Sequence, residues 1–262
     1  MSLTKFAKRG IATAWDLKAR ITPSAPRLTI LYYHAVAADL AGDFDAQMAF
    51  LRRCANIVQA DHSGPLDPVK PNVAVTFDDA FRSVRENALP ALIRHGVPAT
   101  IFVPTGWLGR RPGWTMETSG DRDEEVMSAD EIAGLPTDII TLGSHTVTHP
   151  HLSRLAPGDI DAQLQESRQS LEALLGRTID TLAFPYGDHD SSVVQRAAAA
   201  GYRYVYTVEP QAISAGDRAI SRGRTAADPS DSLGLFALKS RGAYAVMPYF
   251  YRLKRRLRGR SD

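Results

Sequence analysis

Short apolar runs of strand length recur along the chain, and longer segments with helical spacing of apolar residues separate them. Parallel strands joined by crossover helices produce this alternation, because each connection must return the chain to the same end of the sheet. The pattern predicts an α/β fold with about seven strand and helix repeats. The predicted strands are Leu28–Tyr33, Val73–Phe77, Ala99–Val103, Ile139–Leu142, Thr181–Phe184, Tyr204–Thr207 and Ala219–Ser221.

Five intervening segments have the spacing of helices: Asp45–Asn56, Val84–His95, Ser128–Leu135, Asp159–Leu175 and Ser191–Ala200. Gly96, Gly176 and Gly201 lie close after three of them, as glycine commonly does at helix ends. Segment 104–127 is rich in Gly, Pro and Arg and then polar, so we expect an ordered excursion or lid over the fold. No sequence repeat or second domain is visible, which predicts a single-domain (β/α) barrel.

Length and composition agree with one barrel. The chain has 262 residues and a mass of 28.6 kDa, which suits a large α/β domain. Its 44% hydrophobic and 23% charged residues are sufficient for a packed core, which excludes wholesale disorder. The single cysteine, Cys54, excludes an internal disulfide and a metal cage built from cysteines.

Charge is unevenly distributed along the chain. Residues 1–27 carry six Lys or Arg against one Asp, residues 239–262 carry eight against one, and the body between them carries 17 against 27 acidic residues. An acidic body argues against a nucleic acid partner, which needs basic groups clustered on the folded domain. We therefore expect a basic N-terminal segment (1–27), one folded domain (28–238) and a basic, amphipathic C-terminal tail (239–262).

The C-terminal tail joins aromatic residues at 244–251 to five basic residues at 252–258. This composition is typical of a segment that lies on an anionic membrane surface, and a solvated tail packed partly on the barrel is the alternative. No run reaches the roughly 18 to 20 apolar residues of a membrane-spanning helix. The N-terminal segment is too short and interrupted for a secretory signal, so we expect a cytoplasmic protein with peripheral contact at the inner face of the membrane.

Polar residues follow most of the predicted strands. The carboxyl ends of barrel strands meet at one face, where the functional groups of such folds gather. The residues at these positions are His34, Asp78, Asp79, His145, His149, Tyr186, Asp188 and Arg222. The sequence therefore predicts a site at this face.

Two pairs among these residues have a spacing that suits a metal ion. Asp78 and Asp79 would point to opposite faces of an extended backbone unless the chain turns there, so one can ligate while the other stays free. His145 and His149 are four residues apart, and one helical turn or a tight loop would bring both imidazoles to one point. Two histidines and Asp79 would leave coordination positions open for water and substrate, which suits catalysis. The alternatives are a solvated helix cap for the aspartates and surface positions for the histidines.

These residues carry a resemblance to the polysaccharide deacetylases that share the NodB homology domain, carbohydrate esterase family 4. The first family motif, Thr-Phe-Asp-Asp-Gly, is matched at 76–80 except for Ala80. The second, His-Ser/Thr-x-x-His, is matched at 145–149. The third, Arg-x-Pro-Tyr-Gly, appears at 183–187 with Ala183 in place of Arg. The resemblance covers roughly residues 28–225.

The resemblance implies a distorted (β/α)7 barrel and a role for each matched residue. Asp79, His145 and His149 would hold a divalent metal, in first place Zn²⁺, and Asp78 would be the general base. A metal of this kind lowers the pKa of bound water towards about 7 and polarises the acyl carbonyl, and a free carboxylate accepts the proton as the water attacks. The resemblance gives the backbone N–H of Tyr186 a place in stabilising the oxyanion.

One departure from the family is the arginine of the third motif, which orients the catalytic aspartate. Relatives whose third motif also begins with an aromatic residue before Pro-Tyr-Gly often carry an arginine after the last strand. Arg222 is therefore the first candidate to orient Asp78, and Arg224 is the second. A surface position for Arg222 is the alternative.

The other departure is the late Leu-x-His motif, the family's source of the catalytic acid, because no histidine follows His189. The segment Tyr33-His34-Ala35-Val36 resembles the opening of the branch that includes poly-N-acetylglucosamine deacetylases, where an early histidine enters the site. An imidazole can donate a proton to the leaving amine, so His34 is the first candidate for the acid. His189 is the second, and a histidine hydrogen-bonded under a loop is the alternative for His34.

The sequence therefore predicts a metal-dependent hydrolase that removes N-acetyl groups from an amino-sugar-containing saccharide, as in exopolysaccharide biosynthesis. A deformylase or deacylase of a lipid-linked amino sugar is the second candidate, and O-deacetylation is a weaker third. A catalytically inactive carbohydrate-binding relative would explain the two departures, but the retained Asp78 and metal set argue against it. The identity of the sugar and the oligomeric state stay open.

Overall fold

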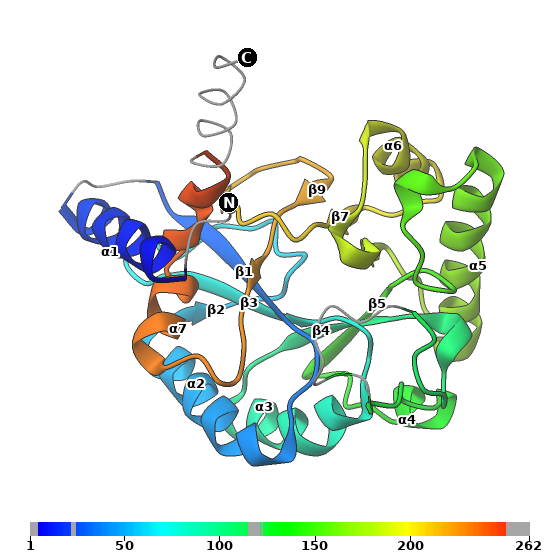
Figure 1. Ribbon diagram of the computed structural model, residues 1–262, viewed down its shortest axis with the longest axis horizontal. Helices are drawn as coiled ribbons and strands as arrows, with labels where there is room; N and C mark the ends of the chain where they lie inside the picture. The colour runs from blue at the N-terminus through cyan, green and yellow to red at the C-terminus, as the bar shows by residue number, and fades with distance from the viewer. Residues whose placement is uncertain (1–4, 22–24, 115–120, 122, 250–262) are drawn as a thin grey trace.

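A computed structural model describes residues 5–21, 25–114, 121 and 123–249. One curved, mostly parallel sheet forms a nearly closed barrel with helices around it (Figure 1). The strands are β1 (Arg27–Tyr33), β2 (Asn56–Ile57), β3 (Asn72–Phe77), β4 (Ala99–Val103), β5 (Ile140–Ser144), β6 (Thr181–Ala183), β7 (Tyr204–Tyr206), β8 (Ala212–Ser214), β9 (Ser221–Arg222) and β10 (Thr225–Ala226). The predicted single-domain barrel is confirmed.

The strand order β10-β1-β3-β4-β5-β6-β7-β9 is parallel throughout, with β2 added beside β3 and β8 antiparallel beside β1. β9 and β10 are consecutive in the chain but pair with opposite ends of the sheet, which brings the two ends together. Only Gly223 and Arg224 separate them. Parallel register places the carboxyl ends of the strands at one face.

The helices are α1 (Lys5–Ile21), α2 (Ala41–Cys54), α3 (Leu89–His95), α4 (Ala129–Ala133), α5 (Pro157–Leu175), α6 (Ser191–Ala199) and α7 (Leu233–Ser240). Local sequence explains several of their ends. Ser128 and Glu131 form a capping box at the start of α4, and Asp190 caps α6. Gly96 ends α3 with φ 58°, a left-handed conformation that glycine adopts without a side-chain clash.

Apolar residues pack in three places. The largest cluster lies between the sheet and the helices and includes Phe77, Leu92 and Leu164. A second cluster includes Ile30, Phe102 and Tyr206, whose neighbours in the strands belong to the first cluster, so that the two line opposite faces of the sheet. A third joins α1 to α7 and the turn that follows it, η7 (Ala243–Val246).

All seven predicted strands begin and end within two residues of observed ones, and Ala99–Val103 has the observed bounds. The last one, Ala219–Ser221, is found at Ser221–Arg222. The predicted helix Val84–His95 begins with a π turn, η2 (Val84–Ala88), before α3. Helices α1 and α7 and the short strands β2, β8 and β10 were not predicted.

The predicted excursion at 104–127 leaves β4 through the turn η3 (Thr105–Trp107). An antiparallel bridge between Phe81 and Val126 attaches its far end to the chain after β3. Residues 115–120 and 122, the middle of the predicted lid, lie outside the described residues, as does the part of the predicted tail from 250 to 262.

Candidate metal and catalytic site

The two adjacent aspartates after β3 point to different partners because the backbone turns between them. Asp78 is still tied to β1 by its N–H, which donates to the Tyr33 carbonyl at 2.9 Å. Asp79 and Ala80 then adopt φ values of 68° and 51°, in the left-handed region that few side chains occupy. The chain therefore turns between the two aspartates, which allows one carboxylate to ligate a metal while the other stays free.

Asp79, His145 and His149 come together at the carboxyl ends of β3 and β5. One ligand atom from each lies within 4.8 Å of the others, and all three side chains are buried. The His145 Nε2 is 3.5 Å from the Asp79 Oδ1, and the His149 Nε2 is 3.3 Å from the same oxygen. Among the described residues this is the one group of three or more histidine, cysteine or acidic side chains with such a geometry.

His145 is oriented by the backbone. Its Nδ1 lies 2.8 Å from the Ala183 carbonyl and donates to it, because a carbonyl can only accept. The proton is thereby held on Nδ1, and the Nε2 lone pair faces Asp79 and His149. Burial lowers the pKa of His145 to about 4, so the ring is neutral at pH 7 and able to ligate a metal.

The second histidine reaches the same point through a tight loop, not a helix. Thr146 and His149 have φ values of 66° and 60°. The Thr146 hydroxyl accepts from the His149 N–H, and the Gln163 side chain on α5 accepts from the N–H groups of Val147 and Thr148. α5 therefore holds the loop that presents both imidazoles.

Asp78 is held by Arg224. The guanidinium donates two parallel hydrogen bonds to the carboxylate, at 2.6 and 2.8 Å, and both side chains are buried. Arg224 also donates to the Thr207 carbonyl and the Thr76 hydroxyl. Burial raises the pKa of Asp78, but Arg224, with His145, outweighs burial and lowers it to about 2. The carboxylate is therefore ionised at neutral pH.

The first candidate for this orienting role, Arg222, is wrong, and the second, Arg224, is in contact with Asp78. Arg222 donates to the carbonyls of Ala60 and His62 and lies over the Tyr204 ring, 3.8 Å from its centroid. Arg222 is the last residue of β9, and Arg224 lies two residues further, where the chain crosses to β10. The prediction failed because the strand ends one residue later than expected.

Two other residues predicted for the site, His34 and Tyr186, lie at the same face of the barrel. His34 directly follows β1, and it is a minor contributor to the lowered pKa values of Asp78 and Asp79. The Tyr186 ring packs edge-on against His149, at 4.6 Å between centroids. Its own backbone is left-handed, with φ 58°.

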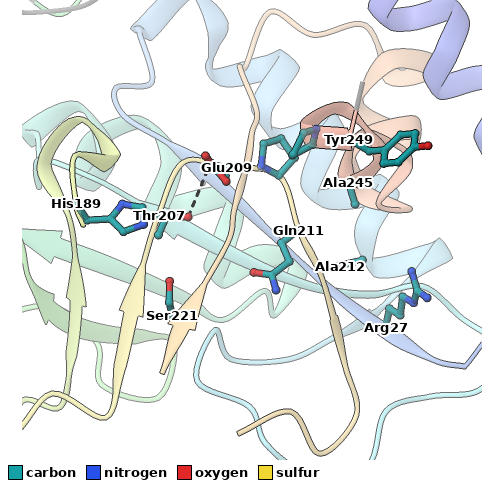
Figure 2. Close-up of a pocket in the computed structure, with 11 residues that line it drawn as sticks. Arg27, His189, Thr207, Glu209, Gln211, Ala212, Ser221, Ala245 and Tyr249 are labelled. Carbon is teal, nitrogen blue, oxygen red and sulfur yellow. Dashed lines mark hydrogen bonds between the residues drawn. The ribbon is translucent and has the colours of Figure 1, made fainter. Parts of the chain in front are cut away.

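His189, the second candidate for the acid, lies elsewhere. Its ring stacks on Phe184 and its Nδ1 donates to the Gly187 carbonyl. It lines a cavity of about 390 Å³ together with Thr207, Glu209 and Gln211 (Figure 2). Asp78 and the three residues of the metal group do not line this cavity.

Sequence reasoning missed two rings beside the site. Trp114, in the excursion after β4, stacks on His149 at 4.4 Å between centroids. His151 stacks on Tyr186 at 4.0 Å. Neither residue belongs to a motif, and the proximity of His151 to His149 was the one available signal.

The residues present fit a divalent cation. The Asp79 Oδ1 and the His149 Nδ1 are buried without a hydrogen-bond partner, and an unpaired carboxylate oxygen in this setting is costly. Two imidazoles and one carboxylate are a ligand set that divalent transition metals accept. The group therefore has the composition, burial and orientation of a metal site.

Comparison with known proteins points to the same family as the sequence motifs. The family model described as polysaccharide deacetylase matches residues 66–205, about half of the chain. Among curated proteins, YxkH of Bacillus subtilis, whose name places it with polysaccharide deacetylases, is 24% identical over 211 residues, covering 76% of this chain and 71% of YxkH. The poly-beta-1,6-N-acetyl-D-glucosamine N-deacetylase of Staphylococcus aureus is 25% identical over 148 residues, covering 55% of this chain and half of that protein.

Solved structures agree with the fold. IcaB from Ammonifex degensii has a TM-score of 0.68 at 25% identity, with 83% of this chain and 98% of that chain covered. The Streptococcus pyogenes deacetylase PplD has a TM-score of 0.69 at 21% identity, with 83% and 99% covered. Together with the family match and the motif residues gathered at one face of the barrel, these similarities show that the chain belongs to the polysaccharide deacetylase family of hydrolases.

Proposed function

We propose that this protein hydrolyses the N-acetyl group of an amino sugar in a saccharide, with Asp78 as the general base. The relatives named above support this substrate class, since one of them is a poly-beta-1,6-N-acetyl-D-glucosamine N-deacetylase. Asp79, His145 and His149 would hold the divalent cation, in first place Zn²⁺. When bound, such a cation polarises an acyl carbonyl and lowers the pKa of water.

The observation that carries the proposal is that two neighbouring carboxylates have different partners. Asp79 faces two imidazoles, while Asp78 faces one guanidinium that occupies both of its oxygens. Arg224 fixes the Asp78 side chain and keeps it ionised, which is the form that accepts a proton. A carboxylate with this function must not ligate the metal, and the left-handed turn at Asp79 keeps the two apart.

Two further residues complete the proposed chemistry. The backbone N–H of Tyr186 would donate to the oxygen of the tetrahedral intermediate, because the Tyr186 ring lies against His149 at the edge of the site. His34 would donate the proton that the leaving amine requires, since it follows β1 at the carboxyl face of the barrel and an imidazolium N–H can donate a proton.

The test is release of acetate or formate from N-acylated amino sugars in free, polymeric and lipid-linked form, by protein reconstituted with Zn²⁺. We expect wild type to release acetate and Asp78→Asn to lose release while retaining its metal content. His34→Gln should lower kcat strongly, whereas His189→Gln, the matched histidine outside the site, should leave it near wild type.

Other outcomes separate the alternatives. Formate release, or a preference for a lipid-linked substrate, would favour the deformylase or deacylase of a lipid-linked amino sugar. No release from any substrate by metal-loaded wild type would favour an inactive carbohydrate-binding relative. Equal activity of wild type and Asp78→Asn would exclude Asp78 as the base.

A further inference from the structure

The two histidines of the metal group are oriented in different ways. His145 donates its Nδ1 proton to the Ala183 carbonyl at 2.8 Å, the kind of hydrogen bond that usually orients a metal-binding imidazole. The His149 Nδ1 is buried and, among the described residues, has no hydrogen-bond partner. The Thr146 hydroxyl holds the backbone N–H of His149, but this bond does not fix the plane of the ring. The orientation of the His149 imidazole therefore depends on other contacts.

Trp114 covers one face of this imidazole. The centroids of the two rings are 4.4 Å apart and their planes differ by 24°, which is a stacked arrangement. Tyr186 and His145 meet the same ring edge-on, with centroids at 4.6 and 4.8 Å. Rotation of the imidazole out of its plane would break the stack with Trp114. Stacking therefore favours the orientation in which the His149 Nε2 faces Asp79.

Trp114 is itself held by two aromatic side chains. Trp107 meets it edge-on at 5.6 Å, and Phe81 lies nearly parallel to it at 6.5 Å between centroids. Gly113 passes so close to Trp107 that a Cβ at this position would clash with the indole ring, so the chain takes this path because residue 113 has no side chain. Phe81 follows Asp79 by two residues. Trp114 therefore packs against the segment that supplies the carboxylate of the metal group.

The backbone of the excursion after β4 is bonded to both segments that supply the metal group. Near its start, the Gly106 N–H donates to the Val147 carbonyl, in the loop that carries the histidines, at 2.9 Å. At its end, the Met127 N–H donates to the Ala80 carbonyl, next to Asp79, at 2.9 Å. The excursion is therefore attached on both sides of the tryptophan that stacks on His149.

We propose that Trp114 is a positioning residue for metal binding, which holds the His149 imidazole in the orientation that a divalent cation requires. An indole supplies no ligand atom, so Trp114 acts through His149 alone. Stacking gives His149 the constraint that the Ala183 carbonyl gives His145. The inference rests on the proposed metal site and adds to it a residue that belongs to none of the three motifs.

An aromatic ring beside a saccharide site can instead stack on the sugar. The ring contacts of Trp114 among the described residues are with His149, Trp107 and Phe81. A positioning role predicts a change in metal affinity, whereas a sugar contact predicts a change in KM. The two roles are therefore separated by measuring both quantities on one variant.

The test is Zn²⁺ affinity of the full chain, measured by competition with a chromogenic chelator. Trp114→Leu should weaken Zn²⁺ binding about tenfold, as expected when a residue that orients a metal ligand is removed. Trp114→Phe keeps a ring that can stack and should remain within about threefold of wild type. Phe50→Leu on α2, where the ring meets Phe236 at 6.0 Å, is the matched control and should bind Zn²⁺ like wild type.

Two further measurements separate positioning from a general loss of structure. Deacetylation by Trp114→Leu, relative to wild type, should rise with Zn²⁺ concentration while KM stays near wild type. Without metal, the losses in unfolding free energy caused by Trp114→Leu and by His149→Ala should not add, because either substitution removes the same stack.

Circular dichroism establishes that each variant is folded, and Trp114→Met is the second variant where Trp114→Leu fails to fold. Unchanged Zn²⁺ affinity in the folded variant would overturn the inference and leave the proposed function standing; a raised KM with that result would assign Trp114 to the saccharide. Equal losses of affinity in Phe50→Leu, or in Trp114→Phe, would also overturn it. A wild type that binds no Zn²⁺ would reject the proposed metal site and this inference with it.

Discussion

Arg224 and Asp78 are 146 residues apart in the chain, and their side chains meet through two parallel hydrogen bonds inside the barrel. The Arg224 guanidinium is also surrounded by aromatic rings, with Tyr32 at 4.8 Å and Phe102 at 5.4 Å from its central carbon. A planar cation that donates four hydrogen bonds and lies beside these rings has little freedom to move. The position of Asp78, the proposed base, is therefore set by Arg224, which lies between β9 and β10.

Arg224→Met should lower kcat by about a hundredfold or more, because a displaced base loses its alignment with the attacking water. Burial raises the pKa of Asp78, and the variant removes the main opposing charge. The pKa should therefore rise from about 2, and the acid limb of kcat/KM should move to higher pH. A pH profile of kcat/KM tests this, and an unchanged acid limb would contradict it.

Arg222→Met provides the matched comparison inside the same barrel. The substitution leaves the carbonyls of Ala60 and His62 without this donor and removes the cation from the Tyr204 ring. We expect a loss of about 2 to 4 kcal/mol in the free energy of unfolding, with kcat near wild type in the folded fraction. Denaturant unfolding measures the first quantity and steady-state kinetics the second; a large fall in kcat at full folding would assign Arg222 to the site.

Removal of the metal should destabilise the protein. A ligand at a hundred times its Kd contributes about 2.7 kcal/mol, which corresponds to a fall in Tm of about 5 to 10 °C for a chain of this size. Thermal unfolding with and without a chelator measures the shift. His149→Ala should show no response to added Zn²⁺, and a response equal to wild type would place the metal elsewhere.

Glu131 should give a pH-dependent contribution to stability. The Ser128 backbone N–H and then Arg82 lower the pKa of Glu131, against the opposing effect of burial. A lowered pKa in the folded state gives stability that is present above the ordinary value of 4.5 and is lost as pH falls through the folded value.

Glu131→Gln should therefore be less stable than wild type at pH 7, by less than about 1 kcal/mol, and the difference should disappear in acid. Urea unfolding at pH 7 and pH 3 measures it, with Glu166→Gln, an exposed residue of α5, as the control. A difference that persists at pH 3 would show that charge is not the cause.

The barrel could be predicted because its strands are buried on both faces and read as apolar runs. Segments that lack this signal were missed. β10 has two residues, Thr225 and Ala226, and α1 owes its place to a partner at the far end of the chain. The local sequence pattern carries no information about packing between segments that lie so far apart in the chain.

The metal group could be predicted because its three members sit in two short motifs, at strand ends that a parallel sheet must bring together. Arg224 could not be separated from Arg222 in this way. Their difference depends on where β9 ends, and strand ends shift by one or two residues for reasons of tertiary packing. Trp114 lies in an excursion whose path no local rule determines.

The ion pair between Asp16 and Arg241 joins residues that are 225 positions apart in the chain. The pairing of β1 with β10 likewise joins the beginning of the barrel to its end. Neither contact can form until almost the whole polypeptide has been synthesised. Contacts of such sequence separation make folding slow, because the entropy of closing the loop is lost before the contact stabilises anything. The seam of the barrel and the packing of α1 against α7 therefore both depend on contacts between residues near the two ends of the chain.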